Sequence, residues 1–233
     1  MGLRAVRELT VKKLRGSNHL RGRHVFEISD AGVTVYASLG NHDSRDQRLY
    51  KPFNMDGRLY YTLKAPRQDV RFFALETSYL EPAQIQWLEK ELASSNEAWK
   101  IPYFHHPLYS SGGRHGSDLA KRQVLEPLFV KHGVSVVLAG HDHVYERVKP
   151  QQGIVHFVVG SSGQLRRGNL RRTDFTAAGF DQDQVFLLAE IDGDEMYFQA
   201  VTRTGRIVDS GMIQRRKPEP TTSSRLTAPP PGP

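Results

Sequence analysis

Three short histidine-bearing motifs contain the residue types that could do chemistry in this chain. The motifs are Gly-Asn-His-Asp at 40–43, His-His-Pro at 105–107 and Gly-His-Asp-His at 140–143. Imidazole nitrogens bind zinc, iron and manganese, and a carboxamide oxygen adds a hard ligand. Asn41, His105, His141 and His143 therefore form a coherent candidate ligand set for metal ions.

Each motif taken alone also has an ordinary structural explanation. A single histidine at a strand end commonly makes a plain hydrogen bond or lies at the surface, and residues 40–43 fit an Asx-type turn. The motifs are informative together because each follows an apolar run of strand type. Loops at strand ends are where α/β sheets tend to bind ligands.

Strand and helix patterns alternate around these motifs. The expected strands are 33–39, 59–63, 70–75, 99–104 and 134–139, and the expected helices are 82–93 and 119–131. After residue 154 the pattern changes to runs that predict antiparallel hairpins, at 154–159, 185–191, 196–201 and 207–210. The layout favours an α/β fold with a mixed sheet and a β-rich end.

Length and composition predict one folded domain with extra segments at both ends. The chain has 233 residues, of which 38% are hydrophobic. We expect a basic, weakly structured or helical segment over 1–29, the domain over 30–213, and a disordered Pro-rich tail over 214–233. No run approaches the roughly 18 apolar residues of a membrane span and no secretory signal is visible, so we expect a soluble chain of unassigned compartment.

Charge and cysteine content exclude or weaken several function classes. The chain has no cysteine, which rules out disulfides and thiolate metal ligands. A net charge of +7 could indicate nucleic-acid binding. The excess lies in arginine-rich end and loop segments, and no recognition motif accompanies it, so no nucleic-acid partner is expected.

The three motifs, in this order and at these intervals, resemble the calcineurin-like metallophosphoesterases. The sequence GHDHVYER from residue 140 most resembles the purple acid phosphatase branch of that family. The resemblance covers about residues 33–211. It implies a sandwich of two mixed β-sheets flanked by helices, and hydrolysis of a small-molecule phosphate ester by metal-activated water. Substrate choice would lie in loops such as 51–58 and 110–117, and the sequence sets no oligomeric state.

The resemblance also implies a role for each motif residue. Asn41, His105 and His141 would bind one metal ion and His143 another, with iron, zinc or manganese as the metals. His42 and Asp43 would be the catalytic pair: His42 contacts the substrate phosphate or leaving group, and Asp43 orients His42. In the family pattern the histidine two places before proline is the ligand, so His106 is interpreted as a supporting or surface residue.

The first part of the family pattern has no counterpart before Gly40. That part consists of an Asp-x-His motif and a Gly-Asp-x-x-Tyr motif, which supply the bridging carboxylate and the first βαβ portion of the fold. Residues 193–197 match Gly-Asp-x-x-Tyr formally, but their position between two strand-like runs predicts a hairpin turn. A start assigned too far downstream and a true loss both fit this absence. We expect a single weak metal site with impaired catalysis; the alternative is a non-catalytic metal-binding remnant or scaffold of the same fold.

Overall fold

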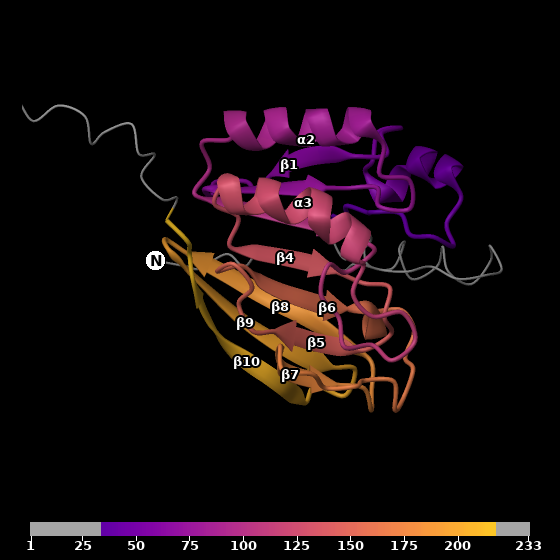
Figure 1. Cartoon of the computed structure of the whole chain (residues 1–233). Helices are drawn as coiled ribbons and strands as arrows, with labels where there is room; N and C mark the ends of the chain where they lie inside the picture. The colour runs from indigo at the N-terminus through magenta and orange to yellow at the C-terminus, as the bar shows by residue number, and fades with distance from the viewer. Residues whose placement is uncertain (1–33, 218–233) are drawn as a thin grey trace, which may run out of the picture.

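Two β-sheets and two long helices make up the body of the protein. The computed structural model describes residues 34–217, so the predictions for residues 1–29 and for the end of the tail lie outside the described residues. The large sheet has the strand order β1-β2-β3-β4-β6-β5-β7, and the small one has the order β10-β9-β8. The expected α/β class, with two sheets and flanking helices, is confirmed (Figure 1).

Most strand bounds follow the apolar runs, but the strands at 145–148 and 176–180 were not expected from the sequence. The large sheet contains β1 (Tyr61–Lys64), β2 (Val70–Ala74), β3 (Trp99–Phe104), β4 (Val136–Ala139), β5 (Tyr145–Val148), β6 (Val155–Val159) and β7 (Thr176–Phe180). The small sheet contains β8 (Val185–Asp192), β9 (Glu195–Thr202) and β10 (Ile207–Gln214). Strands β2, β3, β4 and β6 are parallel neighbours, whereas β1, β5, β7 and the whole small sheet pair antiparallel.

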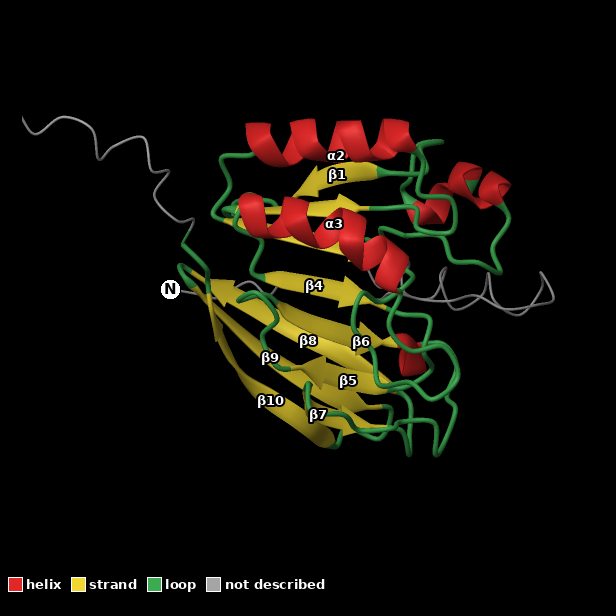
Figure 2. Cartoon of the chain, in the orientation of Figure 1, coloured by secondary structure: helices red, strands yellow, loops and turns green. Residues whose placement is uncertain are grey.

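Three layers result, with the large sheet in the middle (Figure 2). Helices α2 (Pro82–Ser94) and α3 (Leu119–Lys131) cover one face, and the small sheet packs on the other. Strand β4 shows why this works: Val137 contributes to the core beneath the helices, while Val136 and Leu138 contribute to the core shared with the small sheet. Because both faces are covered, β4 is fully buried and reads as a continuous apolar run.

The strand expected over 33–39 is wrong for its described part, residues 34–39. This segment belongs to neither sheet. Its apolar side chains pack against the core shared with the small sheet. Its backbone is held in other ways: Ala37 N donates to Phe53 O (3.1 Å) and the Tyr61 hydroxyl donates to Ala37 O (2.6 Å). The apolar pattern correctly predicted that these side chains are packed against the core, but the segment does not pair with a strand.

The formal Gly-Asp-x-x-Tyr match is a hairpin turn, as predicted. Asp192 pairs with Glu195 at the end of the β8–β9 ladder, which leaves Gly193 and Asp194 as the turn. Gly193 has φ +55°, in the left-handed region that glycine adopts readily. Beyond β10, Arg215 bonds to the Asp194 carboxylate. Within residues 34–217, no helix has the length and apolar character needed to cross a bilayer.

Candidate metal centre

The centre lies where the parallel strands of the large sheet end. His105 and His106 directly follow β3, and His141 comes two residues after β4. Parallel neighbours end at the same edge of a sheet, so the loops after β3 and β4 meet there. One ligand atom from each of these three histidines lies within 4.8 Å of the others.

Asn41 joins this group from the separate segment before β1. Its Oδ1 lies 2.9 Å from His105 Nε2, and His105 Nε2 lies 2.9 Å from His141 Nδ1. Two ligand atoms that each lie about 2.0–2.1 Å from one ion are about 2.9 Å apart at a right angle and about 3.3 Å apart at the tetrahedral angle. One oxygen and two imidazole nitrogens at this spacing fit a single metal ion.

Two backbone features bring these side chains together. An ideal Cβ on Gly40 would lie 2.6 Å from Nδ1 of the His105 ring, so only glycine lets residues 40–43 approach this closely. His141 has φ +64°, which is uncommon for a residue with a side chain. The turn around it is closed by the bond from Asp142 N to Gly140 O (2.8 Å).

His106 belongs to the cluster although its sequence interpretation was a supporting or surface residue. Its backbone N–H donates to the Thr77 hydroxyl (3.1 Å), and its Nδ1 lies 3.0 Å from the same oxygen. Its ring centroid is 4.6 Å from that of His141. Thr77, just after β2, therefore fixes His106 at the edge of the centre.

The other predicted site residues lie around this group. His42 is exposed on the turn formed by residues 40–43. Asp43 closes that turn, since its Oδ2 accepts from Gly40 N (2.8 Å) and its own N–H donates to Gly40 O (2.9 Å). Residues 40–43 therefore form a turn, but the Asp43 carboxylate bonds three residues back and not two residues on, as it would in an Asx-type turn. His143 is buried but is not part of the three-histidine group found within residues 34–217.

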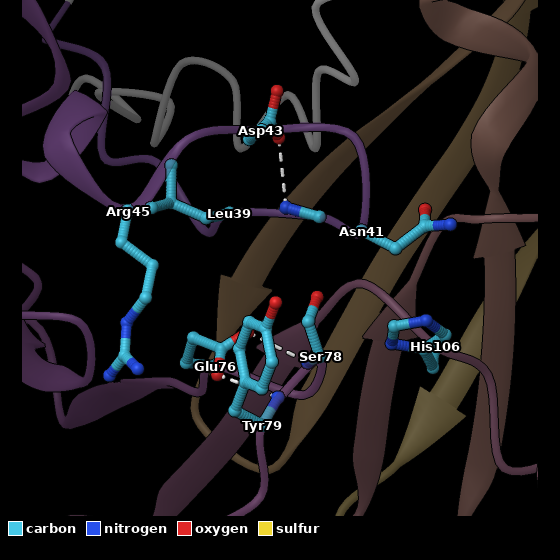
Figure 3. A pocket seen from close by; sticks show the side chains of 9 residues that line it. Leu39, Asn41, Asp43, Arg45, Glu76, Ser78, Tyr79 and His106 are labelled. Atoms are coloured by element: carbon cyan, nitrogen blue, oxygen red, sulfur yellow. Dashed lines mark hydrogen bonds between the residues drawn. The ribbon is translucent and has the colours of Figure 1, made fainter.

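A cavity of about 180 Å³ opens beside the cluster (Figure 3). It is bounded by the turn after β2 that contains Glu76 and Tyr79, by His106, and by Leu39, Gly40, Asn41, Asp43 and Arg45. The Glu76 carboxylate accepts the Ser78 and Tyr79 N–H groups (2.7 and 2.8 Å). In Figure 3, Asn41 and His106 lie at one end of the cavity and Arg45 lies at the other.

Comparison with known proteins places the chain in a family. Residues 15–145, more than half of the chain, match the family model described as calcineurin-like phosphoesterase. The chain is a calcineurin-like phosphoesterase. Its relatives include purple acid phosphatases, the branch that the GHDHVYER sequence most resembles.

This phosphoesterase is similar to several curated acid phosphatases. It is 28% identical to rat tartrate-resistant acid phosphatase type 5, over 86% of this chain and 74% of that protein. It is 34% identical to the Fe(3+)-Zn(2+) purple acid phosphatase 12 of Arabidopsis thaliana, over 48% of this chain but 26% of that protein. Human acid phosphatase type 7 is 26% identical over 84% of this chain and 56% of its own length. The chain thus spans between about a quarter and three quarters of these relatives.

Solved structures share the fold of this phosphoesterase. GAP50, described as the anchor in the inner membrane complex of Plasmodium, has a TM-score of 0.69 at 18% identity, covering 79% of this chain and 68% of that one. A dimetal phosphatase from Danio rerio has a TM-score of 0.62 at 17% identity, covering 84% and 80%. At these identities the likeness concerns the fold alone.

One residue of the phosphoesterase's centre was not among the predicted site residues. His115, in the loop 110–117 between β3 and α3, places its ring centroid 4.1 Å from that of His141. From the sequence, Arg114 or His115 could contact phosphate, but a mobile polar loop was the favoured interpretation. The residue that follows His115, Gly116, donates its N–H to Asp142 Oδ2 (3.0 Å), a contact between residues 26 positions apart that the sequence does not signal.

Proposed function

We propose that this phosphoesterase hydrolyses small-molecule phosphate esters at a metal ion held by Asn41, His105 and His141. The observation that supports this most strongly is the 2.9 Å spacing between neighbouring ligand atoms from three separate segments. A bound iron, zinc or manganese ion would lower the pKa of a water ligand and neutralise charge on the phosphate oxygens.

The residues around the ion divide the remaining tasks. His42 is exposed on the same turn as Asn41, where it can donate a proton to the leaving oxygen. Asp43 fixes that turn through Gly40 N, and so sets the position of His42 indirectly. The cavity beside His106 receives the leaving group, with Arg45 and Tyr79 at its far end; the Arg45 guanidinium lies 5.3 Å from the Tyr79 ring centroid.

His143, which directly follows Asp142 in the sequence, is proposed as a ligand of a second metal ion. No carboxylate from residues 34–217 joins the histidine cluster to bridge two ions. We therefore propose weak turnover at a single metal site, with a non-catalytic metal-binding or scaffold role as the alternative. A neighbour in fold, GAP50, is described as an anchor, which is consistent with that alternative.

Turnover of an aryl phosphate in the presence of added Mn²⁺, Zn²⁺ or Fe²⁺ tests the proposal. The expected result is metal-dependent hydrolysis that is lost in His105→Ala and reduced about 100-fold or more in His42→Ala, which removes the proton donor. His42→Ala should still bind the metal, which makes it the matched control for His105→Ala. If the unsubstituted protein binds one metal ion but neither it nor the two variants hydrolyse the aryl phosphate, the result would support the scaffold alternative and end the enzyme proposal for this chain.

A further inference from the structure

The small sheet buries one face and exposes the other. Side chains such as Leu187 and Ile213 point into the core shared with the large sheet. Because side chains alternate between the two faces of a strand, the residues between them point outward and form the outer face. Among residues 34–217, seven large hydrophobic side chains are exposed, and three of them, Tyr197, Ile207 and Met212, belong to this outer face. Exposed apolar side chains that gather on one face, unlike scattered ones, are typical of an interaction surface.

The strand register places the outward side chains in rows across the sheet. Residues directly opposite each other in antiparallel strands are close neighbours on one face. The first row, next to the β9–β10 turn, is apolar: Val201 lies opposite Phe186 on β8 and opposite Ile207 on β10. Two rows further along β9, Tyr197 lies opposite Met212. The outer face thus has an apolar row at one end and two large apolar side chains near the other.

This arrangement of rows is complementary to itself. A second copy, related by a two-fold axis that crosses the strands at the row between those two, reverses the order of the rows. Leu188 lies in that middle row, so the Leu188 side chains of the two copies face each other. Val201 of one copy then faces Tyr197 of the other, and Ile207 faces Met212. Apolar side chains therefore meet apolar side chains at both ends of the contact.

Opposite charges lie beyond the apolar rows and follow the same symmetry. Arg203 comes two residues after Val201, at the β9–β10 turn, and Glu195 begins β9 at the opposite end of the sheet. The two-fold axis places Arg203 of one copy at Glu195 of the other, and it repeats this contact at the other end. Arg203 Nε bonds to Asp183 Oδ1 (2.7 Å), but its side chain stays 64% exposed in that pair. The guanidinium can therefore reach a second carboxylate.

We propose that the outer face of the small sheet is the interface of a two-fold symmetric dimer of this chain. The apolar rows supply the free energy of association, and the two Arg203–Glu195 contacts set the direction in which one sheet lies on the other. The metal centre lies at an edge of the large sheet. The dimer is thus independent of the proposed function and holds whether or not the chain hydrolyses phosphate esters.

The size of the face sets the strength of the dimer. Each of the three strands has 8 residues. With about 3.4 Å per residue and about 4.8 Å between strands, they present roughly 400 Å² per copy. Stable complexes bury about 800 Å² per partner. At the β8 edge Phe186 faces Glu190, which is the least favourable contact of the arrangement. The dimer is therefore weak and reversible, and its population rises with protein concentration.

Sedimentation equilibrium of the full chain, from about 1 to about 200 μM, tests the dimer. The expected result is monomer at the lowest concentration and mostly dimer at the highest. Met212→Lys should raise the dissociation constant about 30-fold or more, because it places a charge twice in the apolar contact. Leu119→Lys makes the same kind of change at an exposed residue of α3 and should leave the constant unchanged. Monomer at every concentration, as when residues 1–33 cover the face instead, or equal effects of the two variants, would overturn the proposal.

A charge exchange tests the two-fold arrangement itself. Arg203→Glu brings two carboxylates together at both ends of the interface, and Glu195→Arg brings two guanidinium groups together, so each should raise the dissociation constant about tenfold. The double variant restores both pairs and should return to within about threefold of the unsubstituted protein. Lys90→Glu, on the exposed side of α2, controls for the change in net charge and should have less than a twofold effect, by order of magnitude. A double variant that associates no better than the single variants would overturn the arrangement and the proposal with it.

Discussion

The candidate metal centre joins two halves that the chain holds in different ways. The strand half, His105 and His141, follows the parallel strands β3 and β4 and is buried, with exposures of 3% and 9%. The loop half, residues 40–43, follows a segment that belongs to neither sheet, and Asn41 is exposed. The strand half is placed by the fold. The loop half is placed mainly by what it touches, above all the His105 ring against Gly40 and Asn41.

This difference between the two halves predicts which substitutions affect the centre most. Strand residues are fixed before any ligand binds, so they can hold an ion with little reorganisation. Loop residues gain order from the ion and from the strand half. Substitutions in the strand half should therefore have larger effects than equivalent substitutions in the loop half, and the following predictions test that order.

The largest effect is expected from His141→Ala. It removes a proposed ligand that the fold has already placed. Zn²⁺ affinity should therefore fall more than about 100-fold, which is the largest loss expected when only an outer-sphere partner of a ligand is removed. Calorimetric titration with Zn²⁺ measures this. His156→Leu, in the neighbouring strand β6 but outside the cluster, should bind Zn²⁺ at pH 7.5 as the unsubstituted protein does. A fall of less than threefold in His141→Ala would contradict its assignment as a ligand.

The next effect concerns stability at low pH. Burial, and secondarily the charge of Arg122, lower the pKa of His156 to about 3. The unfolded chain takes up this proton near pH 6.5 and the folded one only near pH 3, so stability falls as the pH drops through that window. Between pH 6.5 and 4.5 the free energy of unfolding should fall by about 2 to 3 kcal/mol because of this one histidine.

Urea unfolding across this pH range checks that loss. In His156→Leu the contribution disappears, and the curve of unfolding free energy against pH should be flatter than that of the unsubstituted protein by this amount. Parallel curves for the two proteins would show that His156 is not the buried neutral group described here.

A smaller effect is expected where the two halves touch. Gly40→Ala places a methyl group against the His105 ring and should destabilise the protein by about 2 kcal/mol, typical of overpacking in a tight site. In a His105→Ala background the same change should cost less than about 0.5 kcal/mol. Unfolding in urea measures both, and equal costs would mean that the halves are not in contact.

The smallest effect is expected in the loop half. Asn41→Ala removes an exposed oxygen that is a proposed ligand, and it should weaken Zn²⁺ binding about tenfold, or about 1.4 kcal/mol. Calorimetric titration under the same conditions as for His141→Ala gives the comparison directly. An Asn41→Ala loss larger than that of His141→Ala would reverse the order of the two halves.

The sequence predicted the strand half well for a physical reason. A run such as residues 134–139 is apolar throughout because both faces of β4 are covered, and the ends of parallel strands meet at one edge. Order and spacing of the motifs were therefore enough to place His105 and His141. The hairpin at Gly193 was also predicted from the sequence, because a two-residue turn between apolar runs has few other conformations.

What the sequence could not predict depends on distant partners. Residues 34–39 have strand-like apolar character, but that character does not show that a paired strand is present. Strand β7 has small and half-buried residues and so carries no pattern to detect. Asp142 looks like an exposed acid in a loop, and its partners Ser110 and Gly116 are 32 and 26 residues away. Contacts of that kind decide how the loop 110–117 covers the centre.

Anomalous diffraction from crystals grown with Zn²⁺ tests the central claim most directly, namely that both halves meet at one ion. The account predicts an anomalous peak about 2.0–2.2 Å from Asn41 Oδ1 and from one nitrogen each of His105 and His141. An ion bound only by other residues, or no anomalous peak at these three side chains in crystals grown with Zn²⁺, would contradict it.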